Sequence, residues 1–271
     1  MNGPIAQLVA TTCYGNASLR RVADIPRFFP DNSTCQFCER ISFVEIKTPL
    51  IGKQREVTIA DTPDEWFRYL KNRGAYGIRL IHQRQNNPEI SDRMSAGFVG
   101  GGGIWALGVR FRAITEYWMS RWEMSNQDDP EKQIWRVTYG RAGRQAGIFS
   151  PGLGRIAVRS DFISALLQIR AFSEKHNCDF TEFFSRALKS LKENSSEHEY
   201  HNDLWVPGTL SESSQTILDA AQSAWVFGGM GSWNDMMFEG DEEREYERVS
   251  EQLFSALIGA ICFAANETDA E

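Results

Sequence analysis

Two cysteines and two histidines stand at spacings that could support chemistry. Cys35 and Cys38 are separated by two residues, and thiolates at this spacing can share a zinc ion or cycle as a redox pair. A structural zinc site needs two further ligands, and the chain has no second Cys-x-x-Cys. A thioredoxin-type pair should follow a strand and open a helix, which this segment does not do. We therefore interpret both residues as structural cysteines.

The histidines give a weaker pattern. His198 and His201 lie in a run of Ser, Glu and Asn, and one residue too few separates them for the metalloprotease motif. His82 and His176 have no accompanying Ser, Cys or carboxylate pattern of a nucleophilic triad. We predict no catalytic residue, no metal and no cofactor. An enzyme in which Cys35, Cys38, His198 and His201 converge in space remains the alternative hypothesis.

The glycine-rich stretches 97–104 and 152–155 do not match a phosphate-binding loop. Neither ends in Gly-Lys-Ser/Thr, and neither opens a helix with Gly-x-Gly-x-x-Gly. Flexible or tight turns are the simpler interpretation, because glycine adopts backbone conformations that other residues avoid.

Composition restricts the class of protein. The chain has 271 residues, of which 42% are hydrophobic and 12% aromatic, and this is enough for a sizeable core. Five cysteines, an odd number, favour a reducing compartment over a disulfide framework, so we expect a cytoplasmic protein. The net charge of −7 argues against nucleic acid as a direct ligand and favours a basic protein partner.

We expect neither a targeting segment nor a membrane segment in this sequence. No basic residue precedes the short apolar run that begins at Ile5, so we expect no signal peptide. The most apolar stretch, 253–265, is interrupted by Ser255 and Gly259 and is typical of a core helix. We therefore expect no membrane span.

Residues 41–139 have the pattern of strands with one inserted helix. Thr62, Pro63 and Glu65 form a capping box, which predicts a helix from residue 63 that stops at Gly74. The polar connection 125–130 predicts a long hairpin between two aromatic strands. Alternation and aromatic runs predict strands at 41–46, 56–60, 77–82, 104–112, 116–124 and 133–139.

The second half of the chain has helical spacing. After a Gly- and Arg-rich connection at 140–159, apolar residues recur at steps of three and four. Asp179 is the expected N-cap of the second of these helices, with Glu182 at its third position. Helices are predicted at 162–172, 179–191, 214–225 and 242–266.

This order of elements predicts an α+β fold. We expect a β-rich region at 1–145 and a helical region at 146–271, joined in one continuous domain. The sequence leaves open whether residues 1–40 pack on the sheet or form a separate arm.

An acidic segment follows a glycine-rich turn near the C-terminus. Three glycines lie among the four residues 228–231, and eight acids but only two arginines occupy 235–251. A solvated helix face with acids near its N-terminus accounts for this pattern. An acidic docking surface for a basic cleft is the sharper hypothesis.

The segment Phe227-Gly228-Gly229-Met230-Gly231-Ser232-Trp233-Asn234-Asp235, with the acidic helix after it, resembles a motif of small bacterial immunity proteins. The Trp-rich sheet is also similar in style to immunity proteins of polymorphic toxin and type VI secretion systems. The resemblance implies a cytosolic, non-enzymatic antidote that binds a cognate effector and occludes its active site. The acidic balance favours a basic effector, and a nuclease is the obvious member of that class.

Two surfaces are predicted to bind this partner, one acidic and one aromatic. The residues are Trp233, Asp235, Glu239, Asp241, Glu242 and Glu243, with Trp118 and Trp122 of the hairpin as a second surface. A scaffold that self-associates through its Trp-rich sheet is a further alternative.

Overall fold

The computed structural model describes residues 1–47, 55–85, 89–146, 155–195 and 200–268. Its strands are β1 (Cys38–Lys47), β2 (Arg55–Ala60), β3 (Gly77–Gln83), β4 (Ile104–Arg110), β5 (Ile114–Met124) and β6 (Trp135–Ala146). Its helices are α1 (Gly3–Leu19), α2 (Pro63–Asn72), α3 (Asp92–Ser95), α4 (Arg155–Lys175), α5 (Thr181–Glu193), α6 (Glu212–Ser223) and α7 (Asp241–Asn266). Single 3-10 turns are η1 (Ser33–Cys35) and η2 (Trp233–Asp235).

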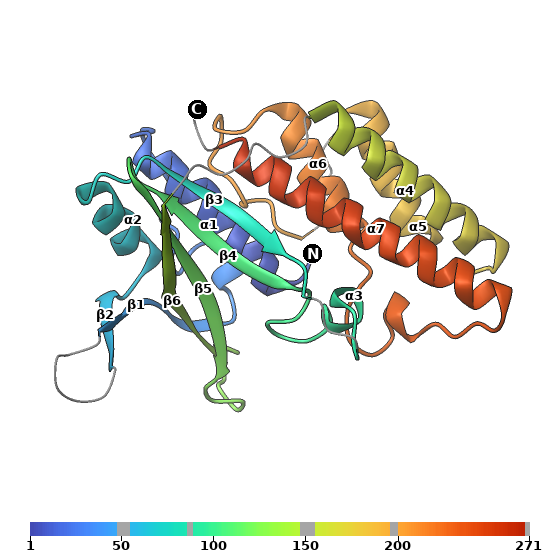
Figure 1. The fold of residues 1–271 in the computed structure, drawn as a ribbon, viewed down its shortest axis with the longest axis horizontal. Coiled ribbons are helices and arrows are strands. Elements are labelled where there is room, and N and C mark those ends of the chain that lie inside the picture. The colour runs from blue at the N-terminus through green and yellow to red at the C-terminus, as the bar shows by residue number, and fades with distance from the viewer. Residues whose placement is uncertain (48–54, 86–88, 147–154, 196–199, 269–271) are drawn as a thin grey trace.

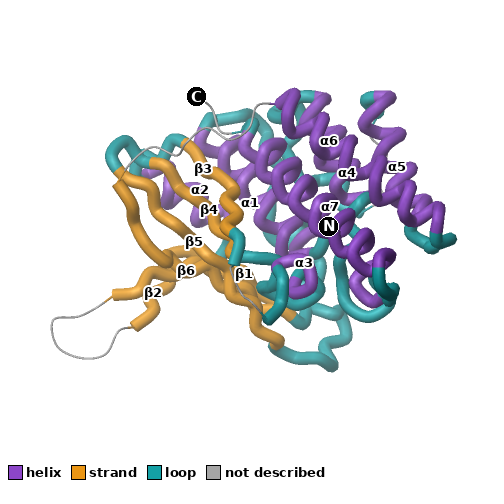
Figure 2. The backbone as a smooth tube through the Cα atoms, turned by 45° about the vertical axis from the view of Figure 1, so that its right-hand side comes forward, coloured by secondary structure: helices purple, strands orange, loops and turns teal. Residues whose placement is uncertain are grey.

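The six strands form one mixed sheet in the order β2-β1-β6-β5-β4-β3. Only β1 and β6 run parallel, and the other neighbours are antiparallel. The sheet lies at one end of the molecule and helices α4 to α7 gather at the other, with α1 between them (Figures 1 and 2). This arrangement confirms the predicted α+β fold.

Several local predictions are confirmed in detail. The hydroxyl of Thr62 accepts a hydrogen bond from the backbone N–H of Glu65 at 3.2 Å, which caps α2 as the sequence pattern predicts. The stop at Gly74 has the positive φ of 80° that glycine tolerates. The hairpin of β5 and β6 pairs from Met124 with Trp135 to Ile114 with Ala146. Helix α7 starts and ends within a residue of its expected bounds.

Helix α1 is the longest element that the sequence patterns did not indicate. The side chain of Asn2 caps its N-terminus by accepting a hydrogen bond from the Ile5 N–H at 3.0 Å. Thirteen of its 17 residues are buried, because the helix contacts the sheet, α2 and α7 together. A helix buried on all sides shows no amphipathic stripe, so periodicity does not reveal it. Residues 1–40 therefore form part of the core and not a separate arm.

Two asparagines close one edge of the sheet. The side-chain amide of Asn16 in α1 donates to the carbonyl of Ile78 at 2.8 Å and accepts from the same residue's N–H at 2.7 Å. Asn266 at the end of α7 makes the equivalent pair with Leu80, at 2.9 and 2.7 Å. These bonds satisfy the free side of edge strand β3 and join it to both helices.

Several element boundaries differ from those expected. The predicted connection at 140–159 is wrong at both ends, since β6 continues to Ala146 and α4 begins at Arg155. Glycines suggested a loop, but Arg141 and Arg144 extend the strand by pairing with Glu116 on β5. The predicted cap at Asp179 is also wrong, because Phe180 is the N-cap of α5 and makes no side-chain capping bond. The predicted turn at 152–155 lies outside the described residues except for Arg155.

One hydrophobic cluster spans both predicted regions of the chain, from Ile5 to Ala265. Helix α7 has the length and mean hydropathy of a membrane span, but 56% of its most apolar window is buried inside the protein. The described residues therefore form a compact fold in which this weakly membrane-like helix packs as a core element.

Candidate protein-binding surface

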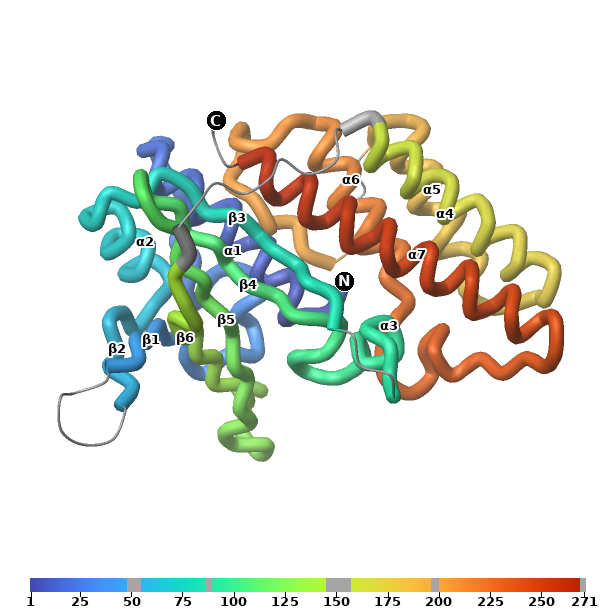
Figure 3. Tube along the Cα trace, in the orientation of Figure 1, coloured from blue at the N-terminus to red at the C-terminus, as the bar shows by residue number. Residues whose placement is uncertain are grey.

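Two glycine-containing segments, 92–103 and 227–235, meet beside the N-terminal half of α7 (Figure 3). A Cβ atom on Gly97 would overlap the backbone carbonyl of Gly228, so the two main chains touch where both residues lack a side chain. A Cβ on Gly101 would likewise overlap the carbonyl of Ser95. The glycines therefore allow close packing of two loops rather than the cradling of a phosphate.

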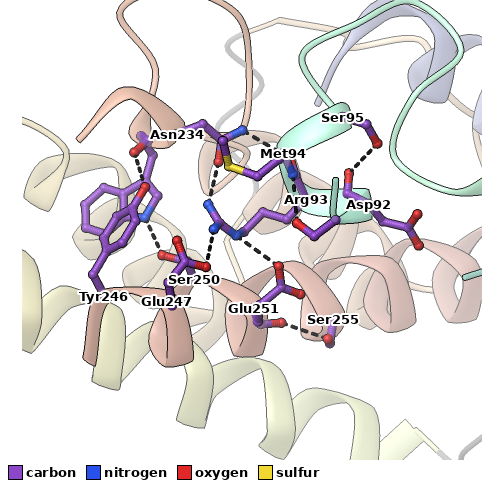
Figure 4. Close-up of polar contacts among 12 residues, drawn as sticks. Asp92, Arg93, Met94, Ser95, Asn234, Tyr246, Glu247, Ser250, Glu251 and Ser255 are labelled. Atoms are coloured by element: carbon purple, nitrogen blue, oxygen red, sulfur yellow. Dashed lines mark hydrogen bonds and ion pairs between the residues drawn. The ribbon is translucent and has the colours of Figure 1, made fainter. Parts of the chain in front are cut away.

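Arg93 fastens these loops to α7. Its side chain is only 1% exposed, and its guanidinium lies 2.6 Å from a carboxylate oxygen of Glu247 and 3.1 Å from one of Glu251. It also donates to the side-chain carbonyl of Asn234 at 2.7 Å, while the amide of Asn234 donates to the Arg93 backbone carbonyl at 3.1 Å. Figure 4 shows these contacts converging on Arg93 from the two other segments. The three segments are consequently held as one unit.

Trp233 is a core residue, which corrects its prediction as a partner contact. Its side chain is 0% exposed, and its indole N–H donates to the hydroxyl of Ser250 at 2.7 Å. Its backbone carbonyl accepts a hydrogen bond from Tyr246 at 2.6 Å. The centroid of its ring lies within 5.6 Å of the ring centroids of Phe180, Phe184 and Tyr246. Trp233 therefore anchors the acidic segment to the core, and its side chain does not reach the surface of the protein.

The aromatic hairpin surface is corrected in the same way. Trp118 is 0% exposed and packs against Phe43 and Trp66 in the core. Trp122 is partly buried against Trp135, with their ring centroids 6.1 Å apart. Five of the eight tryptophans are buried and three are partly buried, so none provides an exposed face for self-association.

The acidic residues named from the sequence are on the surface. Asp235, Glu239, Asp241, Glu242 and Glu243 are all exposed, and the last three form the first turn of α7. Acids at this position are stabilised by the partial positive charge of the helix N-terminus. The structure thus places three of the five predicted carboxylates at the N-terminal end of one long helix and the other two, Asp235 and Glu239, in the segment that leads to it.

The five carboxylates differ in whether another group of the chain already binds them. Asp241 pairs with Arg244, and Asp235 accepts a hydrogen bond from the backbone N–H of Gly231. Within the described residues, no ion pair or hydrogen bond engages the side chains of the other three, Glu239, Glu242 and Glu243. These three carboxylates are therefore available to a partner.

Exposed apolar side chains occur on and beside the two segments that meet here, and the sequence patterns did not single them out. Phe98 is 67% exposed, Met230 102% and Met237 92%. Met94 and Val99 add 38% and 48%. A Phe and two Met residues within the two glycine-containing segments, with Met237 just after the second, were the available signal, and it depended on knowing that the segments meet.

The cysteine pair has the environment of structural thiols. Cys35 and Cys38 are each 2% exposed, and burial raises the pKa of the Cys38 thiol to about 11. Burial raises the pKa of Cys35 further still, so both thiols remain protonated at neutral pH. This environment supports the structural interpretation of the pair.

His201 lies near the turn η1 that contains Cys35, as the enzyme hypothesis requires, but it contacts Ser33 and neither cysteine. Its Nδ1 is 2.7 Å from the hydroxyl of Ser33, which also contacts the carboxylate of Asp203. Asp203 in turn accepts from the backbone N–H of Ser33 at 2.7 Å, which fixes the turn. His198 lies outside the described residues, and among the residues described no group of three His, Cys, Asp or Glu side chains could hold a metal.

Comparison of the chain with protein-family models, with curated proteins and with solved structures gave no match.

Proposed function

We propose that this protein is a cytoplasmic immunity protein that binds a cognate toxic effector and blocks its active site. The acidic end of α7 is the contact surface in this proposal. The single observation that carries it is the presentation of three unpaired carboxylates, Glu239, Glu242 and Glu243, on a frame fixed by Arg93 and Trp233. A surface held in place before binding loses less conformational entropy when a partner docks.

The charge of this surface favours a basic partner. Eight acids and two arginines between residues 235 and 251 account for a formal charge of −6, beside −7 for the whole chain. A nuclease must attract phosphate with a basic cleft, and such a cleft also attracts carboxylates. We therefore favour a nuclease as the effector, with the carboxylates taking the place of phosphates.

The segment that resembles immunity proteins, 227–235, also has a structural role that fits this proposal. Gly228 touches the neighbouring loop, Trp233 enters the core and Asn234 binds Arg93. Together these contacts set the position of the acids that follow. The resemblance therefore concerns the residues that present the proposed surface.

The test is affinity capture from a lysate of the native host, with the tagged protein as bait and washes at low and high salt. We expect one stoichiometric partner with a basic nuclease domain, whose activity on DNA or RNA is abolished by the purified protein. Changing Glu239, Glu242 and Glu243 to Lys should abolish both capture and inhibition, because like charges would then face each other.

A matched variant carries the same charge change elsewhere. Asp31, Asp128 and Glu131 are exposed and distant in the sequence from α7, and their change to Lys should leave capture and inhibition intact. Equal thermal unfolding of both triple variants would show that each is folded. Equal loss of binding in the two variants would refute the acidic surface, and a captured partner without inhibited activity would refute the immunity function.

A further inference from the structure

Helices α4 and α7 flank an open cavity of about 460 Å³ along the seam where they pack together. The two helices lie side by side in Figures 1 and 3. They run antiparallel: Arg248 on α7 binds Gln168 on α4, whereas Glu245, earlier on α7, binds Lys175 at the end of α4. The volume falls within the range of about 300–1,000 Å³ that is usual for small-molecule sites.

Gly259, in the interior of α7, keeps one end of this cavity open. Glycine inside a helix lowers stability relative to alanine, so its presence there calls for a reason. A Cβ added at this position would meet no atom within 4 Å, and φ is not positive, so neither close packing nor backbone geometry requires glycine. The missing side chain therefore leaves space in the cavity that Gly259 lines.

Polar side chains at the other end are already oriented by their neighbours. Arg248 donates to the side-chain carbonyls of Gln168 and Gln252 at 2.7 and 3.3 Å, and the amide of Gln168 donates to the hydroxyl of Ser164 at 3.4 Å. No group among the described residues accepts from the amide of Gln252 or from the hydroxyl of Ser164. These two side chains, which we call the donor end, can therefore donate to a ligand beside the charge of Arg248.

Asp161 supplies a carboxylate between the two ends. Across residues 155–195 and the other described ranges, nothing pairs with or donates to its side chain. The hydroxyl of Ser255, which also lines the cavity, accepts from Arg84 and donates to the backbone carbonyl of Glu251 at 2.7 Å, so it has no hydrogen left for Asp161. A cationic group of a ligand would complement this carboxylate.

Helical geometry sets these groups in order along the cavity. Because the helices are antiparallel, each step of one turn back along α4 corresponds to one turn forward along α7, about 5.4 Å. The donor end, with Ser164 and Gln252, comes first, Asp161 follows one turn away, and Val158 and Gly259 lie at the far end. The cavity thus runs from hydrogen-bond donors, past a carboxylate, to an apolar wall.

We infer that this cavity binds an α-amino acid with an apolar side chain. The carboxylate of the ligand accepts hydrogen bonds at the donor end, its ammonium pairs with Asp161, and its side chain extends over Val158 to the space above Gly259. The order of groups in the ligand then matches their order along the cavity. This inference does not depend on the proposed function, because the cavity begins about three turns beyond the acidic first turn of α7.

Calorimetric titration of the intact protein with L-leucine tests the inference. We expect a dissociation constant on the order of 100 µM. Binding should be at least tenfold weaker for 3-methylbutylamine, which lacks the carboxylate, and for 4-methylpentanoate, which lacks the ammonium. Binding of either analogue as tight as that of leucine would overturn the inference. Failure of L-leucine, L-methionine and L-phenylalanine alike to bind or to raise the unfolding temperature would overturn it as well.

Single variants place the binding in this cavity. Asp161→Asn removes the charge that faces the ammonium and should weaken leucine binding at least tenfold. Asp179→Asn, at an exposed position beyond the end of α4, should leave the affinity unchanged. Gly259→Leu should abolish binding by filling the apolar end, and its higher helix propensity should keep the unfolding temperature at or above that of the wild type. Wild-type affinity in Asp161→Asn or in Gly259→Leu would show that leucine binds elsewhere and would overturn the inference.

Discussion

Two buried charges determine how neighbouring segments meet in this protein. Arg93 binds the carboxylates of Glu247 and Glu251 on α7. Glu116 on β5 forms ion pairs with three arginines. The Glu116 carboxylate is 0% exposed and receives two hydrogen bonds of 2.8 Å from Arg73 at the end of α2. Arg141 and Arg144 of β6 approach it to 3.2 and 2.9 Å. A buried ion of this kind is tolerated only while all its partners remain in place.

The ion pairs of Glu116 should make the free energy of unfolding depend on pH in the acidic range. Burial alone would raise the pKa of this carboxyl, but hydrogen bonds from Arg73 and the charges of all three arginines outweigh it and lower the pKa below its usual 4.5. Because the folded pKa lies below the unfolded one, the stabilisation is fully present above about pH 4.5 and is lost as pH falls through the folded pKa. We expect Glu116→Gln to cost about 3 kcal/mol at pH 7.

Urea unfolding of the wild-type protein and the variant between pH 7 and pH 3 measures this effect. The difference in free energy of unfolding should narrow towards pH 3. Glu56→Gln, which removes an exposed partner of Arg121, should cost less than about 1 kcal/mol. If the difference in unfolding free energy between wild type and Glu116→Gln stays constant from pH 7 to pH 3, the arginines do not stabilise the ionised Glu116 carboxylate as described.

At the scale of elements, close contact between loops decides where the candidate surface lies. Helix α3 has four residues and cannot hold its position through its own hydrogen bonds. Its position follows from Arg93 and from the backbone contact between Gly97 and Gly228. These contacts set how the loop that carries α3 lies against α7.

Gly97→Ala should therefore destabilise the protein although it adds a single methyl group. The new Cβ would overlap the Gly228 carbonyl, and backbone atoms cannot rotate away as a side chain can, so we expect a cost of about 2 kcal/mol. Gly143→Ala is the matched control, because no atom lies within 4 Å of its added Cβ. Urea unfolding at pH 7 compares the two variants, and equal midpoints would show that the loops do not pack as described.

At the scale of the whole molecule, one core joins the strand-rich and helical regions. Helix α1 packs on β3, β4 and α7, and Asn16 and Asn266 link two helices to the same edge strand. The acids gather where α7 begins, at the end of the molecule away from β1 and β2 (Figure 1). The division at residues 145 and 146 therefore separates two types of secondary structure and does not divide the core.

A fragment of residues 1–145 should fail to fold alone, because α1 and β3 would lose the apolar surface of α7 that they pack against. We expect a broad, uncooperative thermal transition by circular dichroism and poorly dispersed amide signals by nuclear magnetic resonance. The full chain should unfold in one transition whether monitored by far-ultraviolet dichroism or by tryptophan fluorescence. A cooperative, well-dispersed fragment would show that the β-rich region is an independent domain.

The sequence by itself determined the elements whose signals are local. Alternation predicted the strands, Thr62 and Gly74 marked the ends of α2, and apolar spacing located α7. The exposure of the five acids was also predictable, because charged side chains are seldom fully buried unless a partner compensates their charge. These patterns span a few residues and depend little on the rest of the chain.

The tertiary structure decided everything that depends on contacts between distant residues. It buried Trp118 and Trp233 instead of exposing them, since the core competes with an interface for every large ring. It revealed α1, whose even burial leaves no periodic stripe. It also joined Arg93 to Glu247, 154 positions away, and so brought the loop that carries α3 against α7. Local patterns carry no information about such pairings, because the fold as a whole sets which side chains meet.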